Sequence, residues 1–162
     1  MDKYKNQRIA VLVDVQNMYY SAKNIHKRKV NFGSVLKKAV GERQLIRAIA
    51  YVIKADIKEE INFFEALQSF GYEVKAKDLQ VFLGGAKKGD WDIGIAMDAL
   101  KLSQKVDVLV LVSGDGDFIP LVKYLQEAMG VRVELMAFKE TTSNKLIDEV
   151  DDYFPLDRKF LI

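Results

Sequence analysis

Apolar positions in this chain form short continuous or alternating runs, and segments with helical spacing lie between them. Runs of this length, rich in Val, Ile and Leu and bounded by turn residues, are typical of strands in a buried sheet. Apolar residues that recur every three or four positions predict helices. The expected strands cover residues 8–13, 44–53, 72–77, 106–112 and 131–138. The expected helices run from residue 16 into the basic stretch 23–29, and over 35–40, 57–70, 91–103, 118–129 and 145–150.

The alternation of strands and helices predicts a single domain over residues 1–162. In this α/β arrangement, helices cover both faces of a central, mainly parallel, five-stranded sheet and form a three-layer sandwich. The loop from Asp78 to Asp90 is rich in glycine and lysine and is expected to be flexible. The segment after residue 150 has a mixed pattern, and no element is assigned to it.

Composition limits the chemistry of any site. Of the 162 residues, 49% are hydrophobic and 30% are charged, as in an ordinary globular protein. The chain has no cysteine, which excludes disulfides, thiolate zinc sites and thiol nucleophiles. Because His26 is the only imidazole, a metal site must use oxygen ligands, and these favour Mg²⁺ or Mn²⁺ over zinc. The net charge of +2 permits nucleic acid binding but does not require it.

Nothing in the sequence suggests a membrane protein. The first residues carry charge but no apolar signal segment, and no later run approaches the roughly 20 apolar residues of a membrane helix. A cytoplasmic protein without membrane association is therefore expected.

Acidic residues are expected to meet at one edge of the sheet. Asp14 ends the first strand, and Asp115 and Asp117 follow the fourth strand. The helix that holds Asp92 runs into the fourth strand, so its N-terminus lies on the side of the strands' carboxyl ends, where ligands collect in α/β sheets. Asp98 lies about 9 Å further down that helix. It is expected to be a supporting or surface residue rather than a metal ligand.

Each acid alone has a structural explanation as a turn residue, a helix cap or a favourable charge at a helix N-terminus. Together they have a cost, because carboxylates about 5 Å apart repel by about 3 kcal/mol per pair at an effective dielectric constant of about 20. Such a cluster needs either protons or a cation. A hard divalent cation bound by carboxylates can activate water and stabilise charge on a phosphodiester. Metal-dependent phosphodiester hydrolysis is the reaction class that these residues indicate.

An enzyme of this class needs cations outside its acid cluster to hold the phosphate backbone. Lys87 and Lys88, in the glycine-rich loop before Asp92, are the best candidates. A second basic patch comprises Lys23 and residues 27–29, with Tyr19 and Tyr20 nearby as surfaces for base stacking. The alternative for this patch is a solvated helix face with buried tyrosines.

Other acidic α/β folds fit less well. A haloacid-dehalogenase-type phosphatase requires a second aspartate two residues after the first, where this chain has Gln16. Neither a Walker phosphate-binding loop nor a Gly-x-Ser-x-Gly elbow is present. A response-regulator receiver requires adjacent acids after the first strand, whereas only Asp14 is found there.

Three segments resemble the motifs of NYN domains, the PIN-like nuclease group that includes LabA-like proteins. Residues 13–17 (Val-Asp-Val-Gln-Asn) resemble the strand-end Asp-x-x-Asn motif. Residues 88–92 (Lys-Gly-Asp-Trp-Asp), followed by Asp98, resemble the Lys-Gly-x-x-Asp helix start and its second aspartate. Residues 113–118 (Ser-Gly-Asp-Gly-Asp-Phe) resemble the Ser-Gly-Asp-x-Asp-Phe motif almost letter for letter. The similarity spans about residues 8–154.

This resemblance implies a PIN-like fold with the central strand order 3-2-1-4-5 and a ribonuclease centre that depends on Mg²⁺ or Mn²⁺. It implies single-stranded RNA as the partner, although the residues alone do not distinguish RNA from single-stranded DNA, and a homodimer is left open. The implied metal ligands are Asp14, Asp92 and Asp115, with Asp117 as a further ligand or as the residue that orients water. The implied supporting groups are Asn17 and Ser113.

A second functional class fits the same residues. In this alternative the protein is a non-catalytic RNA-binding or regulatory module that keeps a Mg²⁺ or Mn²⁺ site for structure or recognition. RNA cleavage in the presence of manganese separates the two classes.

Overall fold

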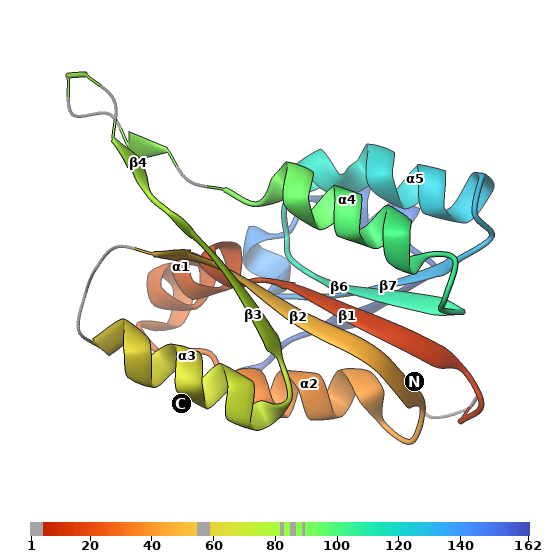
Figure 1. Ribbon diagram of the computed structural model, residues 1–162, viewed down its shortest axis with the longest axis horizontal. Helices are drawn as coiled ribbons and strands as arrows, with labels where there is room; N and C mark the ends of the chain where they lie inside the picture. The colour runs from red at the N-terminus through yellow and green to blue at the C-terminus, as the bar shows by residue number, and fades with distance from the viewer. Residues whose placement is uncertain (1–4, 55–58, 82, 85–86, 89) are drawn as a thin grey trace.

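The computed structural model of the protein describes residues 5–54, 59–81, 83–84, 87–88 and 90–162. A parallel sheet runs through the centre of the molecule in the order β3-β2-β1-β6-β7-β8 (Figure 1). The predicted α/β architecture is therefore confirmed. The strands of this sheet are β1 (Arg8–Asp14), β2 (Gln44–Lys54), β3 (Glu73–Asp78), β6 (Val108–Val112), β7 (Arg132–Ala137) and β8 (Asp152–Pro155).

Helices cover both faces of the sheet, as the alternating pattern predicts (Figure 1). The first three helices contribute to the hydrophobic core on one face, and the last three contribute to the core on the other. Both cores meet the central strands β1 and β6, which explains why these strands are apolar on both faces. The helices are α1 (Val15–His26), α2 (Phe32–Val40), α3 (Glu59–Phe70), α4 (Asp92–Leu102), α5 (Ile119–Glu127) and α6 (Asn144–Glu149).

The number of strands is the one correction to the predicted fold. The sheet has six strands rather than five, because the C-terminal segment forms β8 and pairs in parallel with β7. This strand reads Asp-Tyr-Phe-Pro and remains partly exposed at the edge of the sheet. A short edge strand with an acid and a proline lacks the continuous apolar run that marks the buried strands. The other five strands have the order expected for the PIN-like fold.

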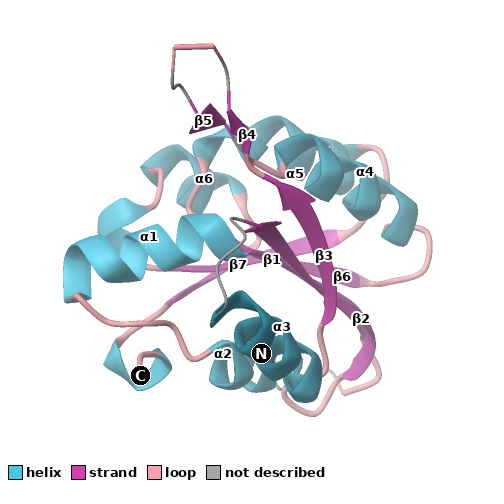
Figure 2. Ribbon diagram, turned by 60° about the vertical axis from the view of Figure 1, so that its left-hand side comes forward, coloured by secondary structure: helices cyan, strands magenta, loops and turns pink. Residues whose placement is uncertain are grey.

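The segment between β3 and α4 contains a short antiparallel pair, β4 (Gln80–Val81) and β5 (Lys87–Lys88). It projects beyond the body of the sheet (Figure 2). The flexibility predicted for residues 78–90 falls partly on positions 82, 85, 86 and 89, which lie outside the described residues. The predicted start of the third helix at residue 57 also lies outside them.

One ion pair is enclosed in the fold at the amino-terminal side of the sheet. The Arg43 guanidinium donates two hydrogen bonds to the Glu134 carboxylate, at 3.0 and 2.9 Å, and a third to the carbonyl of Ala39. Both charged side chains are almost inaccessible to solvent.

Among the residues that the structure describes, no helix combines the length and apolar character that a membrane span requires.

Candidate metal centre

The ends of two central strands bring the first two acids together. β1 and β6 pair in parallel, with Val13 beside Val112, so the residues that follow each strand emerge at the same edge. Asp14 is the last residue of β1, and Asp115 lies in the turn after β6. The expectation that these carboxylates share one crevice is met in the structure.

Two polar side chains join these strand ends. The Ser113 hydroxyl donates a hydrogen bond to Asp14 Oδ2 at 3.2 Å and accepts one from the Asp115 amide at 3.2 Å. The Asn17 amide oxygen accepts a hydrogen bond from the Gly114 amide at 2.9 Å. Asp14 also caps α1, because its Oδ1 accepts a hydrogen bond from the Asn17 backbone amide. These contacts fix both carboxylates relative to the sheet.

Helix α4 supplies the third acid from its first turn, where Asp92 begins the helix. The preceding residue anchors this helix, since Trp91 Nε1 donates a hydrogen bond to the Val52 carbonyl at 2.8 Å and its ring packs against Tyr51. Gly94 is needed for this packing, because a Cβ there would lie 2.4 Å from the indole. The tryptophan is therefore a structural anchor that sets the start of α4.

Asp14, Asp92 and Asp115 form a compact group in which one carboxylate oxygen from each lies within 4.8 Å of the others. Asp14 is 8% exposed, while the other two acids are half-buried. The three side chains come from β1, α4 and the turn after β6, and no two of them are close in the sequence. The group therefore forms only when these three elements are packed together.

Burial and repulsion disfavour charge on this group. Burial raises the pKa of Asp14 to about 6, although hydrogen bonds from Asn17 and Ser113 oppose the shift. The pKa of Asp92 rises to about 7, first through burial and then through repulsion from Asp115 and Asp90. Protonation is one way to relieve this repulsion, and a bound cation is the other.

The donor set fits a hard divalent cation. All three groups offer carboxylate oxygens, which lie within 4.8 Å of one another. Two oxygens that bind one Mg²⁺ at 2.0–2.1 Å are at most about 4.2 Å apart, so a small rotation of the side chains would bring all three into binding distance of one ion. Thiolates are absent from the chain, and no imidazole belongs to the group. The residues present therefore suit Mg²⁺ or Mn²⁺ better than zinc.

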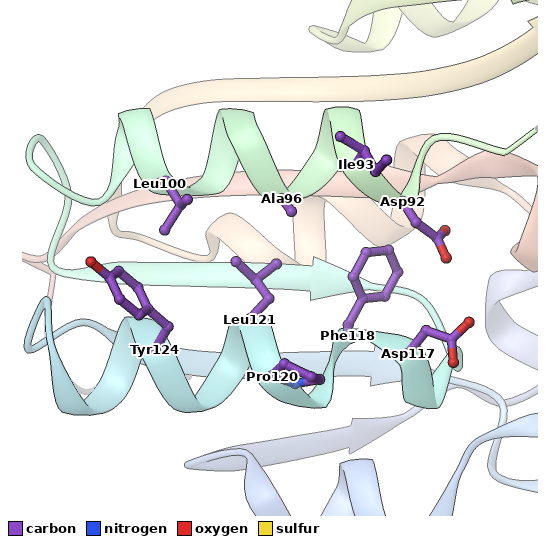
Figure 3. Close-up of a pocket in the computed structure, with 9 residues that line it drawn as sticks. All are labelled: Asp92, Ile93, Ala96, Leu100, Asp117, Phe118, Pro120, Leu121 and Tyr124. Carbon is purple, nitrogen blue, oxygen red and sulfur yellow. The ribbon is translucent and has the colours of Figure 1, made fainter.

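Asp117 lies beside this group of three acids but does not belong to it. Its side chain is exposed, and its backbone amide donates a hydrogen bond to Asp115 Oδ1 at 2.9 Å. Together with Asp92 it marks one end of a groove of about 400 Å³ between α4 and α5 (Figure 3). Apolar side chains, including Ile93, Phe118 and Leu121, line the rest of this groove.

Asp98 faces a different environment, as its distance along α4 predicts. Its carboxylate accepts hydrogen bonds from the Tyr51 hydroxyl and from Lys75 Nζ, both at 2.7 Å. Burial alone would raise the pKa of Asp98, but the hydrogen bonds from Lys75 and Tyr51 lower it below its usual value. Asp98 is therefore a charged, fully paired group that joins α4 to β2 and β3.

One expectation for this region stays untested, and one residue that affects the acid group was not predicted. The backbone of Lys87 and Lys88 forms β5, but their side chains lie outside the described part of the structure, so their role in substrate binding stays a prediction. Asp90 is not among the predicted site residues, yet its charge raises the pKa of both Asp14 and Asp92. Its place two residues before Asp92 is the sequence signal that could have identified it.

The glycines of the turn after β6 allow a close approach of the segment before α6. A Cβ on Gly114 would lie 2.9 Å from the Thr141 carbonyl oxygen, and a Cβ on Gly116 would lie 2.9 Å from Ser143 Oγ. Ser143 caps α6, and its backbone amide donates a hydrogen bond to the Gly114 carbonyl. Larger residues would therefore push the turn away from its support.

A parallel sheet of this strand order, with clustered aspartates at the carboxyl ends of its central strands, places the protein in the PIN-like nuclease superfamily. The sequence pattern of the NYN domain matches residues 8–157. The chain therefore belongs to the NYN domain family.

Two individual proteins are similar over nearly the whole chain. The sequence is 26% identical to the low amplitude and bright protein LabA of Synechococcus elongatus over 165 residues, which cover 95% of this chain and 86% of LabA. A crystal structure of a protein of unknown function from Vibrio parahaemolyticus is 36% identical, covers 100% of both chains and superposes with a TM-score of 0.91. This second likeness supports the observed fold.

Proposed function

We propose that the protein is a divalent-metal-dependent ribonuclease that hydrolyses phosphodiester bonds at the acid group. The observation that carries this proposal is the convergence of three aspartates whose oxygens lie within 4.8 Å, in an environment that raises the pKa values of Asp14 and Asp92. Such a group is costly unless it holds protons or a cation. Membership of the NYN domain family supports nucleic acid as the substrate.

In this proposal, Asp14, Asp92 and Asp115 hold Mg²⁺ or Mn²⁺. The bound metal would lower the pKa of a water molecule and offset the charge that develops on the phosphate. Asp117 lies at the open side of the group, where its exposed carboxylate can accept a hydrogen bond from the attacking water. Its exposure suits orientation of water better than tight ligation.

The remaining site residues act through position. Ser113 and Asn17 connect the end of β1 to the turn after β6 through hydrogen bonds. Asp98 binds β2 and β3 and so helps to position α4, which carries Asp92. Lys87 and Lys88 stand shortly before Asp92 in the sequence, and we assign them to the phosphate backbone of the substrate. Cations outside the acid group are needed because the carboxylates themselves repel phosphate.

The test is cleavage of single-stranded RNA by the purified protein with Mn²⁺ and with EDTA. Asp115→Asn keeps the side-chain oxygen that accepts from the Asp117 amide but removes the charge, so we expect cleavage to be lost while RNA binding is kept. The matched control is Asp107→Asn, which changes a carboxylate at the opposite end of β6 that pairs with Arg8. The control is expected to cleave like the wild type, because an exposed ion pair contributes little to stability.

Three results decide the proposal. Cleavage that requires Mn²⁺ and disappears only in Asp115→Asn supports it. Equal cleavage by Asp115→Asn points to a contaminating nuclease and overturns the assignment. RNA binding without cleavage by the wild type in Mn²⁺ favours the non-catalytic binding module.

A further inference from the structure

The exposed face of α1 combines aromatic and basic side chains next to the acid group. Tyr19 and Tyr20 are 42% and 51% exposed, whereas tyrosine side chains in folded proteins are usually more buried. Their rings meet edge to face at 5.5 Å, and Lys23 Nζ lies 5.9 Å from the centre of the Tyr19 ring. The alternative of buried tyrosines, which the sequence left open, is therefore wrong.

This face of α1 begins near the acid group and extends away from it along the helix axis. Asp14 caps the first turn of α1, and Asn17 holds the Gly114 amide there. Tyr20 lies three residues after Asn17, on the same side of the helix and about 4.5 Å further along its axis. Lys23 and Lys27 follow one and two turns beyond the tyrosines. A strand that leaves the acid group along α1 would thus meet aromatic rings first and cations next.

The charged side chains of α1 and the segment that follows it are all basic. The sequence from residue 15 to residue 41 contains no Asp or Glu, while it contains six Lys or Arg residues. Lys23 lies in the last turn of α1, where it also complements the helix dipole. That structural role explains a cation at this end of the helix but gives no reason for two exposed tyrosines beside it. Rings with adjacent cations are the features that single-stranded nucleic acids bind.

Not all of the basic patch is available for binding. The Arg28 guanidinium donates hydrogen bonds to the carbonyls of Leu161 and Ile162, so this residue fastens the C-terminal segment. Lys27 is the C-cap of α1 and has a left-handed backbone with φ 56°. Its side chain is exposed, and Lys23 is exposed as well. Lys29 is also exposed but lies beyond the end of α1, so Lys23 and Lys27 are the lysines that this helix face offers for phosphate contacts.

We propose that Tyr19, Tyr20, Lys23 and Lys27 form a track for single-stranded nucleic acid that leads away from the acid group along α1. The tyrosines stack on unpaired bases next to the cleaved bond, and the lysines contact the following phosphates. This assignment rests on the proposed nuclease function for the position of the cleaved bond. A duplex is excluded from the stacking contacts, because its bases already stack on one another.

Binding can be measured without cleavage by placing all variants in the Asp115→Asn background. The probe is a fluorescent single-stranded RNA, and anisotropy is recorded over a series of salt concentrations. Tyr19→Ala/Tyr20→Ala is expected to weaken binding by roughly 5-fold to 150-fold for each stacked base that is lost. Lys23→Gln/Lys27→Asn is expected to lower the salt slope by about 0.7 for each lost phosphate contact. Asparagine is chosen at position 27 because it tolerates the left-handed backbone.

The matched control is Lys123→Gln/Tyr124→Ala on α5, where a lysine and a tyrosine are adjacent and exposed on the other face of the sheet. Tyr124 lies at the end of the α4–α5 groove that is away from Asp92 and Asp117 (Figure 3). It is expected to bind like the parent, and duplex RNA is expected to be insensitive to the tyrosine change. Equal binding by the α1 variants and the parent overturns the track and leaves the nuclease function intact. Loss of binding in the α1 variants, together with no cleavage by the wild type, keeps the track and refutes the nuclease. An equal loss in the α5 control also overturns the track.

Discussion

Asp92 and Asp98 lie on the same helix, but the pKa values of their carboxyl groups are shifted in opposite directions. Asp92 is affected by burial and by the neighbouring acids Asp115 and Asp90, which raise its pKa to about 7. Asp98 is paired with Lys75 and Tyr51, which hold its pKa below the usual value. The Asp92 carboxyl group thus needs a proton or a cation, whereas the charge of Asp98 is already compensated by the protein itself.

The first prediction concerns Asp98→Ala. This change leaves the buried Tyr51 hydroxyl and the Lys75 ammonium without their acceptor, so we expect a loss of about 1–3 kcal/mol in the free energy of unfolding. Mn²⁺ affinity should fall much less than in Asp92→Ala, since Asp98 is not part of the acid group and acts on it only through the position of α4. Urea unfolding and calorimetric titration measure the two quantities. Lost metal binding with unchanged stability would contradict both expectations.

The pH dependence of the metal-free protein is a second test. In the folded state the pKa values of Asp14 and Asp92 are about 6 and about 7, whereas the ordinary value is 3.8. Between about pH 4 and pH 7 the folded state therefore binds more protons than the unfolded state, and the free energy of unfolding falls as pH rises through this window. Thermal unfolding in EDTA at several pH values measures this, and millimolar Mn²⁺ should reduce the fall. A rise in stability over the same window would refute the assignment.

Asp14→Asn separates the cost of the charge from the architecture of the turn. Asparagine keeps one oxygen to accept from the Asn17 amide, so the helix cap is kept, and its NH2 group can donate to the Ser113 hydroxyl oxygen in place of accepting from it. At pH 8 in EDTA we expect this variant to be more stable than the wild type by up to 2–3 kcal/mol, on the order of 1.36 kcal/mol for each pKa unit. It should also lose the stabilisation that Mn²⁺ gives the wild type. A variant less stable than the wild type in EDTA would show that the Asp14 charge does not destabilise the metal-free protein.

The buried ion pair gives a prediction that is independent of the site. Glu134→Ala leaves the Arg43 guanidinium enclosed without its partner, and we expect a loss of about 3–5 kcal/mol in stability. The matched control is Glu73→Ala, which removes the partner of Arg47 on the surface and should cost about 0–1 kcal/mol. Chemical unfolding of both variants provides the comparison, and equal losses would rule out the special role of burial.

The central part of the fold and the acid group could be predicted from the sequence because their signals are local. The apolar runs of β1 and β6 mark strands that are buried on both faces, and each run ends in an aspartate or in the Ser-Gly-Asp turn. Since parallel strands end at one edge of the sheet, the approach of Asp14 and Asp115 follows from their places in the sequence. The position of Asp92 follows from the direction of α4.

Other features depend on contacts that the sequence does not express. β8 has only four residues, Asp-Tyr-Phe-Pro, and is partly exposed at the sheet edge, so it lacks the continuous apolar run that would have predicted its pairing with β7. The partners of Asp98 come from β2 and β3, and neither Tyr51 nor Lys75 is near it in the sequence. The exposure of Tyr19 and Tyr20 also depends on how α1 rests on the sheet. These are properties of packing between distant segments, which periodicity alone cannot give.

The origin of the three clustered acids in β1, α4 and the turn after β6 has a consequence for the dynamics of the molecule. A cation held by all three would bind only conformations in which these elements are together, and such a ligand stabilises those conformations by mass action. Amide hydrogen exchange through openings that separate β1 from β6 would therefore slow when the metal is added. Exchange through local fraying at the edge strand β8 would not. Metal binding would thus report on the cooperative opening of the centre of the sheet.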